Sequence, residues 1–128
     1  MENTKIFENK KFGKLRMTVI ENEPYFVASD VAKMLGFKKS EGAVDRYVSQ
    51  KRKIYKKERF ENYVRLFVFI NEDSVYQFIN DSLMPNAPEV RQWIANEVIP
   101  EAYKHIRKLS GDKVKINKIY FVRNTQTR

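Results

Sequence analysis

The side chains with the clearest chemical pattern are lysines and arginines that lie on and around one short predicted helix, residues 40–49. Ammonium and guanidinium groups bind the phosphates of nucleic acids, and an arginine on a helix can also bond both acceptors of a guanine. We therefore interpret this region as a DNA-contacting surface and assign base recognition to Arg46. The candidate DNA-binding residues are Lys38, Lys39, Ser40, Arg46, Ser49, Lys51, Arg52, Lys53, Lys56, Lys57 and Arg59.

Positive charge is unevenly distributed along the chain. The 25 Lys and Arg outnumber the 16 Asp and Glu, for a net charge of +9. Residues 33–67 hold eleven basic and four acidic side chains, residues 68–103 hold one and six, and residues 104–128 hold eight and one. This segregation predicts a positive face that attracts polyanions, an acidic stretch turned elsewhere, and a basic C-terminal arm.

Residue types that many enzymes and metal sites require are missing. The chain has no cysteine, which excludes a disulfide framework, a zinc finger and a thiolate nucleophile, and its one histidine, His105, excludes a site with two imidazoles. Glu97 and Glu101 lie four residues apart, but Pro100 disturbs the geometry needed to hold a divalent ion between them. With no Gly-rich phosphate loop or nucleophile–base pair in the sequence, we expect no enzymatic activity, no cofactor and no metal site.

Length and hydropathy indicate a soluble protein that does not insert into membranes. A chain of 128 residues with 42% hydrophobic residues is the size of one domain with its own core. The longest apolar run, from Leu66 to Ile70, is too short to span a bilayer, and the N-terminus lacks a signal-peptide pattern. We therefore expect an intracellular protein without a membrane partner.

The elements that would position the basic residues begin with an N-terminal β-hairpin. Alternating apolar residues predict strands within residues 6–27, with a turn at residues 21–23. Ser29 and Asp30 have N-cap chemistry, and Gly36 suits the left-handed position that ends a helix. These signals predict a helix of about two turns after the hairpin.

The next elements are predicted to be a helix-turn-helix pair followed by a basic wing. Ala32 would allow the close crossing of two helices, and Gly36 would allow the turn between them. The second helix, residues 40–49, begins at the predicted cap Ser40, and residues 51–65 form the basic β-hairpin that we call the wing. A helix in the major groove and a wing on the flanking phosphates would use all the candidate residues.

Two further helices are predicted in the C-terminal half. Asn71 is a good N-cap for a helix that ends near Asn80, and Pro88 fits the first turn of the last helix, which Pro100 should kink or break. The predicted fold is thus α+β and winged-helix-like, with a domain over residues 1–110. Residues 111–128 are predicted to be a basic extension that is partly disordered or adds a strand.

Several ordered blocks of the sequence resemble one protein family. The block from Phe26 to Phe37 is similar to a block in the BRO N-terminal domain of phage antirepressors and baculovirus repeated-ORF proteins. Similar blocks occur at residues 12–16, 70–76, 82–87, 91–94 and 97–100, so the resemblance covers about residues 7–106. It implies a viral or prophage DNA-binding regulator without a cofactor. Members of this family often carry a second, C-terminal domain, and Ser74 and Val90 depart from the residues common in the family.

Together these observations predict binding of duplex DNA in transcriptional regulation during viral or prophage growth. Single-stranded DNA stays an alternative because Tyr55, Phe60 and Tyr63 interleave with the basic run. A second alternative is a protein-capture module that binds a repressor or a host protein through the acidic stretch 68–103. Whether the protein forms a homodimer is left open by the sequence. The protein would act in the bacterial cytoplasm beside the nucleoid, or in the host nucleus if the virus infects eukaryotes.

Overall fold

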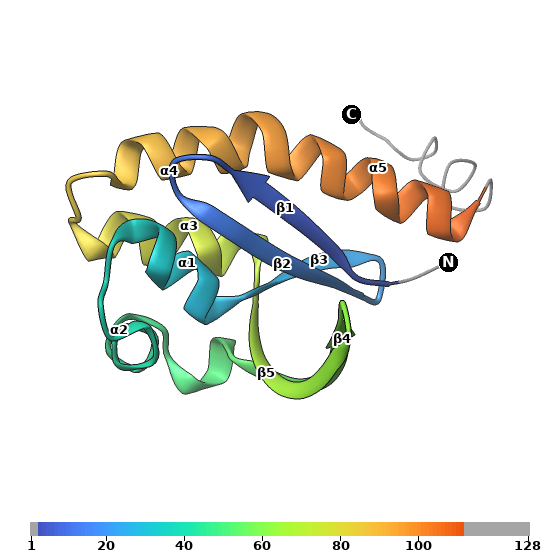
Figure 1. Ribbon diagram of the computed structural model, residues 1–128, viewed down its shortest axis with the longest axis horizontal. Helices are drawn as coiled ribbons and strands as arrows, with labels where there is room; N and C mark the ends of the chain where they lie inside the picture. The colour runs from blue at the N-terminus through green and yellow to red at the C-terminus, as the bar shows by residue number, and fades with distance from the viewer. Residues whose placement is uncertain (1–2, 112–128) are drawn as a thin grey trace.

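The fold is α+β, as predicted, and is built on an antiparallel sheet with the strand order β1-β2-β3-β5-β4 (Figure 1). The computed structural model describes residues 3–111. The predicted extension, residues 112–128, therefore lies outside the described residues. The strands are β1 (Lys5–Asn9), β2 (Gly13–Ile20), β3 (Glu23–Val27), β4 (Ile54–Phe60) and β5 (Tyr63–Asn71). The helices are α1 (Ala28–Leu35), α2 (Ser40–Tyr47), the 3-10 turn η1 (Gln50–Arg52), α3 (Glu72–Ser82), α4 (Ala87–Trp93), the π-helical segment η2 (Ile94–Val98) and α5 (Ile99–Ser110).

The predicted N-terminal hairpin is confirmed as β2 and β3, and a third strand precedes it. Glu21 and Asn22 both have positive φ, which is the backbone of a tight two-residue hairpin turn. The part of the predicted hairpin before residue 21 contains a further turn. In this turn the Asn9 side chain accepts hydrogen bonds from the backbone of Lys11 and Phe12. This turn sends β1 back against β2 and makes β1 an edge of the sheet.

Helices α1 and α2 lie where the sequence places them, but neither uses its predicted cap. Helix α1 begins at Ala28 after the N-cap Val27, and Asp30 lies inside its first turn, where its carboxylate binds Arg16. Ser40 is the first residue of α2 and makes no capping hydrogen bond, and the helix ends two residues before the predicted end at Ser49. Gly36 does end α1 in the left-handed conformation, with a φ of 100°.

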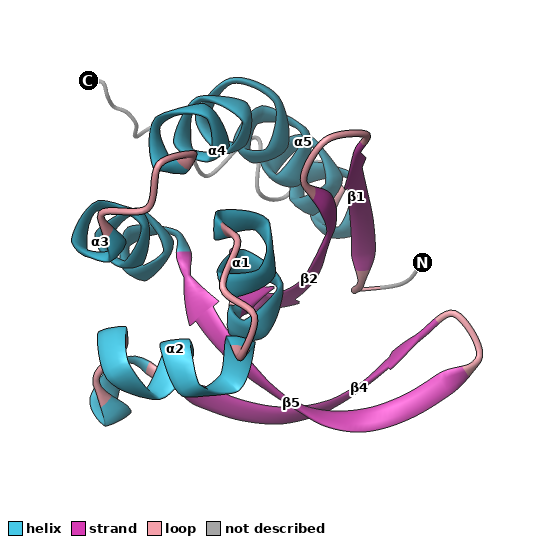
Figure 2. Cartoon of the chain, turned by 60° about the vertical axis from the view of Figure 1, so that its left-hand side comes forward, coloured by secondary structure: helices cyan, strands magenta, loops and turns pink. Residues whose placement is uncertain are grey.

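The main hydrophobic core surrounds α1. Its buried side chains come from β2, β3, α1, α3 and the C-terminal helices, and α2 adds Ala43 and Val44. Figure 2 shows α1 at the centre, with the sheet on one side and α3 and α4 on the other. A second, smaller cluster of Val27, Phe60, Phe67 and Phe69 lies under the β4–β5 hairpin. The hairpin is therefore anchored by its own aromatic residues.

The last helix, predicted to kink or break at Pro100, does not break but continues through this residue, with a π-helical distortion just before it. Helices α4 and α5 are joined without interruption by the π-helical segment Ile94–Val98, and Pro100 sits in the first turn of α5. A π-helical turn widens the backbone locally, which is a common way to accommodate a distortion inside a helix. The stripe of Val90, Ile94 and Val98 therefore stays buried along one face.

We expect Ala32→Leu to destabilise the protein by about 1 to 3 kcal/mol, because it overpacks a filled contact. Ala32 is fully buried in α1, and its carbonyl accepts the backbone N–H of Phe37 in the turn that leads to α2. Urea unfolding measures the change. Ala95→Leu, at an exposed position, is the control and should change stability by less than about 0.5 kcal/mol. Equal stabilities of the two variants would contradict the tight packing of α1.

A pH effect is expected from Tyr103, whose hydroxyl donates a hydrogen bond of 3.0 Å to Glu72. Burial, followed by the charge and hydrogen bond of Glu72, raises the pKa of Tyr103 above its ordinary value. In the unfolded chain the phenol ionises near pH 10, so stability is fully present below that pH and falls as pH rises above it. Tyr103→Phe should be less stable at pH 8 by about 1 kcal/mol and should lose stability less steeply above pH 10. Urea unfolding of both proteins at pH 8 and pH 11 measures the effect. If the difference in unfolding free energy is the same at both pH values, Tyr103 does not cause the loss of stability at high pH.

Candidate nucleic-acid interface

Helix α2 and the β4–β5 hairpin enclose one groove. Only Phe69, Ile70 and Asn71 of β5 pair with β3, so most of the hairpin extends past the sheet beneath α1 and α2 (Figure 2). The groove has a volume of about 330 Å³, and its walls come from α1, α2 and the hairpin, with Lys33, Val44 and Leu66 among the lining residues. The two predicted DNA-contacting elements are thus neighbours in space.

Helix α2 presents a polar outer face with Glu41, Asp45 and Arg46 exposed, because its apolar residues are turned into the core. Val44 and Val48 are buried, and the ring of Tyr47 packs against the rings of Phe37 and Phe78 with centroid distances of 5.7 and 5.8 Å. Arg46 is exposed, and its guanidinium lies 5.6 Å from the centroid of the Tyr47 ring. This cation–π contact limits the directions that Arg46 can take without neutralising its charge.

The basic run after α2 divides into paired and exposed side chains. Arg52 donates to the hydroxyl of Ser74 at 2.9 Å and lies 3.4 Å from Asp73, at the start of α3. Lys53 Nζ lies 2.7 Å from Asp45 of α2, and its side chain is only 6% exposed. These contacts hold α2 and α3 against the start of the hairpin, so both cations serve the structure of this surface.

The hairpin separates the remaining cations by face. Lys56 points to the face that holds Thr18 and Phe60, where it pairs with Glu58, and Glu58 also accepts the Thr18 hydroxyl. Lys57 and Arg59 point to the opposite, exposed face. Among residues 3–111, the predicted basic site residues that are exposed and make no ion pair are Lys38, Lys39, Arg46, Lys51, Lys57 and Arg59.

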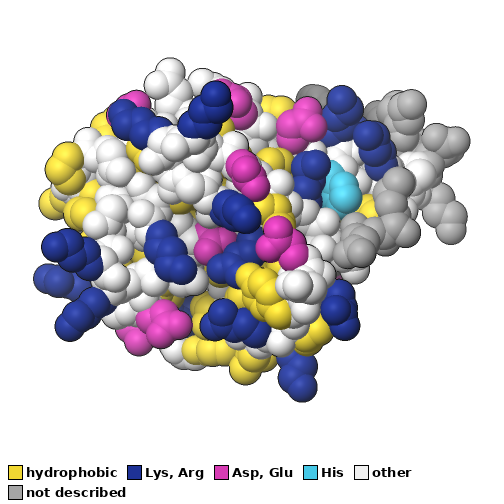
Figure 3. Space-filling view, viewed as in Figure 1, with side chains coloured by type: hydrophobic (Ala, Val, Ile, Leu, Met, Phe, Trp, Pro, Cys, Tyr) yellow, Lys and Arg dark blue, Asp and Glu magenta, His cyan; other side chains and the backbone are white. Residues whose placement is uncertain are grey.

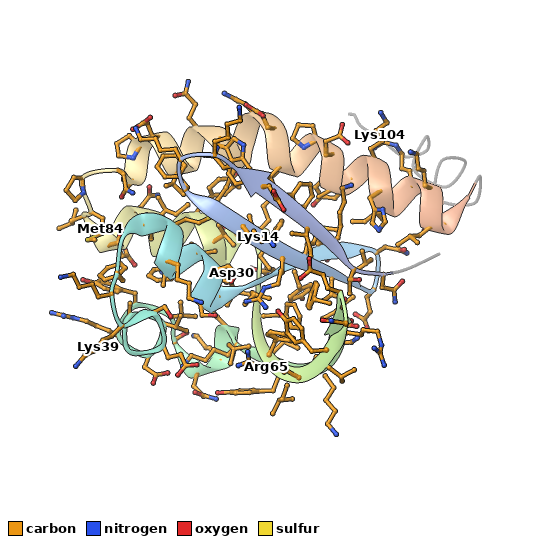
Figure 4. All side chains as sticks on the ribbon, viewed as in Figure 1. Lys14, Asp30, Lys39, Arg65, Met84 and Lys104 are labelled. Carbon is orange, nitrogen blue, oxygen red and sulfur yellow. The ribbon has the colours of Figure 1, made fainter. Side chains whose placement is uncertain are left out.

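Basic side chains gather over α2 and along the hairpin in the space-filling view (Figure 3). In the same orientation, Lys39 lies at the edge of the molecule, whereas Asp30 lies inside it (Figure 4). Ser40 is half-buried beside the groove and Ser49 is exposed after α2. The two serines therefore border the same surface as the exposed cations.

Two of the three aromatic residues that interleave with the basic run make contacts within the protein. Phe60 is buried and meets Phe67 edge-on at 5.2 Å, and the hydroxyl of Tyr63 accepts a hydrogen bond from Arg16. Tyr55 is exposed and accepts a hydrogen bond of 2.9 Å from Gln50. This part of the chain therefore presents one aromatic ring for base stacking, which is a weak basis for single-strand binding.

The residue that sequence reasoning missed is Arg16, which joins α1 to the hairpin. Its Nε and backbone N–H each donate to Asp30 Oδ2 at 2.9 Å, and its Nη2 donates to Oδ1 at 2.8 Å. Its Nη1 donates to the Tyr63 hydroxyl at 2.7 Å, and its guanidinium lies 4.9 Å from the Phe67 ring centroid. The side-chain hydrogen bonds that Arg16 donates to Asp30 are the main reason that the pKa of Arg16 is raised. No local pattern marks this contact, because its partners are 14 and 47 residues away.

Two other kinds of site, metal centres and membrane-spanning helices, find no support in residues 3–111. Over residues 3–111 there is no cluster of three or more His, Asp or Glu residues suited to a metal ion. Trp93 packs against the main core, and Glu97 and Glu101 are exposed. Within the same range, none of the helices is long and apolar enough to cross a membrane.

A family comparison agrees with this geometry. The model of the BRO family, N-terminal domain, matches residues 14–100, which include α1, α2 and the whole hairpin. The chain belongs to the BRO family. The BRO N-terminal domain is a regulatory module of the kind found in phage and viral antirepressors. Neither the curated proteins nor the solved structures contain a match to the chain.

Asp30→Asn is expected to destabilise this BRO domain by about 3 kcal/mol, because it leaves the Arg16 charge poorly compensated in a site that is largely closed to water. The side chains of Arg16 and Asp30 are only 14% and 5% exposed. Glu89→Gln, which removes the exposed pair with Lys11, is the matched control and should cost less than about 1 kcal/mol. Chemical denaturation compares the two variants, and similar losses would show that the Arg16–Asp30 pair is not a special support of the fold.

Proposed function

We propose that this BRO domain binds duplex DNA as a transcriptional regulator during viral or prophage growth. The observation that carries the proposal is that α2 and the β4–β5 hairpin line one groove, while exposed cations flank α2 and project from the hairpin. The family is of a regulatory, DNA-binding type, which supports the same conclusion. The hairpin then acts as the wing of a winged-helix-like module.

Helix α2 is the element that we place in the major groove. Its eight residues span about 12 Å, close to the width of the groove. Gly42 and Ser49 are exposed and short, so they allow the helix to approach the base edges. Arg46 has the planar fork that bonds guanine O6 and N7 together, which makes it the proposed base-reading residue.

The phosphate contacts are assigned to the exposed cations around α2. Lys38 and Lys39 precede the helix, Lys51 follows it, and Lys57 and Arg59 project from the hairpin. Such contacts position the protein on the duplex without reading its sequence. Arg52, Lys53 and Lys56 have partners within the protein, so their proposed role is to orient the surface rather than to bind phosphate directly.

A protein-capture role is the second candidate, and one acidic surface favours it. Glu23, Glu72 and Asp73 line a common pocket with Tyr76 and Tyr103 at the start of α3. A basic segment of a repressor or host protein would complement this charge. In this alternative the α2 surface and the hairpin carry no sequence information.

Selection from random duplex DNA with the full chain tests the proposed function. We expect enrichment of a defined sequence, and weaker binding of a single strand with the same sequence. Affinity should fall steeply with salt, with a log–log slope of roughly −4 to −5 if about five phosphates are neutralised. Failure to enrich any sequence, combined with a flat salt response, would favour protein capture.

Arg46→Ala and Lys57→Ala should weaken DNA binding in different ways. Arg46→Ala is expected to cost about 1 to 3 kcal/mol more on the selected site than on a scrambled site, because a base contact is lost. Lys57→Ala should weaken both sites similarly and reduce the salt slope by about one, because a phosphate contact is lost. Fluorescence anisotropy at several salt concentrations distinguishes the two patterns. The reverse pattern would assign base reading to the hairpin.

A further inference from the structure

Exposed apolar side chains are concentrated on the β4–β5 hairpin. Among the described residues, four of the five exposed large hydrophobic side chains lie there, and Leu66 is 60% exposed. The others in the hairpin are Ile54, Tyr55 and Val64. Single exposed apolar residues are common on protein surfaces, but a group on one small hairpin is less common.

The strand register places Tyr55, Val64 and Leu66 on one face of the hairpin, together with two cations. Lys57 pairs with Leu66, and Arg59 pairs with Val64, and paired residues of antiparallel strands point to the same face. A column of cations on β4 therefore runs beside a column of aliphatic side chains on β5. We call Leu66 and Val64 the aliphatic column. Figure 3 shows yellow apolar side chains beside dark blue basic ones along the edge of the molecule where the hairpin lies.

The opposite face holds the hairpin in place. Phe60, Phe67 and Phe69 form the small aromatic cluster there, and Tyr63 near the hairpin turn is hydrogen-bonded to Arg16. The aliphatic column thus lies on a strand whose other face is packed against the protein. The strand therefore loses little conformational entropy when the column binds a partner.

The aliphatic column also has a fixed relation to the proposed reading helix. Val68, two residues after Leu66 on the same face, lies with Leu66 and with Val44 of α2 in the lining of the shared groove. At a rise of about 3.3 Å per residue, Leu66 stands about 7 Å and Val64 about 13 Å farther out along the strand than Val68. A ligand on α2 therefore reaches the aliphatic column if it continues along the hairpin.

A partner that fits this face must offer negative charge beside an apolar interior. Duplex DNA has both, because phosphates flank each groove and the stacked bases lie between them. Proteins that bind the minor groove often insert leucine or similar side chains between base pairs and bend the duplex. We propose that the hairpin enters the minor groove next to the α2 site, that Leu66 inserts at a base step, and that Lys57 and Arg59 bind the flanking phosphates. This inference rests on the proposed function and adds a specific deformation of the DNA.

The test uses Leu66→Ser in the full chain, with Leu83→Ser as a matched control. Leu83 is even more exposed, at 88%, but lies in the loop between α3 and α4, away from the hairpin. The probe is the selected duplex with 2-aminopurine, a fluorescent base that brightens when it is unstacked, placed at successive positions. We expect the parent protein and Leu83→Ser to raise the fluorescence at one step, and Leu66→Ser to abolish the rise and weaken binding about tenfold. Thermal melting checks that both variants fold.

A second variant and a second readout separate loss of the wedge from loss of binding. Leu66→Phe keeps a large apolar side chain and should preserve the fluorescence rise. Energy transfer between dyes at the duplex ends should report a bend with the parent protein and a straighter duplex with Leu66→Ser. If the parent binds the duplex without a fluorescence rise or bend, the wedge proposal is overturned while DNA binding stands. If the parent binds no duplex, the proposed function itself fails.

Discussion

The ion pair between Arg16 and Asp30 is the interaction on which the arrangement of the surface depends. It joins β2 to the first turn of α1, and through Tyr63 it reaches the β4–β5 hairpin. Removing both charges from water is costly, and the cost is offset because the carboxylate accepts hydrogen bonds at both oxygens and the guanidinium also stacks on Phe67. The main consequence is geometric, since the contact fixes the hairpin relative to α1.

The position of α2 follows from the same support. Gly36 ends α1 and turns the chain, and the ring of Tyr47 packs against Phe37 and Phe78, so α2 is held against α1 and α3. Arg52 and Lys53 then bond to α3 and α2 where the chain leaves toward the hairpin. A surface that must match the spacing of DNA grooves needs this rigidity, because a small displacement of one element would separate its contacts from those of the other.

The features that the sequence predicted are those with local causes. Gly36 at the end of α1, the turn at Glu21 and Asn22, and the Asn71 cap, which accepts the backbone N–H of Ser74, each depend on residues within a few positions. The missed features depend on residues far apart in the chain. Asp30 has the residue type of a cap, and only the approach of β2 shows that its carboxylate serves Arg16 instead. The division of the basic run into paired and exposed cations likewise required the positions of α2, α3 and Thr18.

The hairpin shows how one basic segment can both build a surface and leave charge exposed on it. Successive side chains of a strand point to opposite faces, so Lys56 and Glu58 face the protein while Lys57 and Arg59 face solvent. A shift of the register by one residue would exchange the two sets, burying free cations and exposing the paired ones. The buried Phe60 opposes such a shift, because it would have to leave the aromatic cluster with Phe67. The charge of the outer face is thus determined by the apolar packing of the inner face.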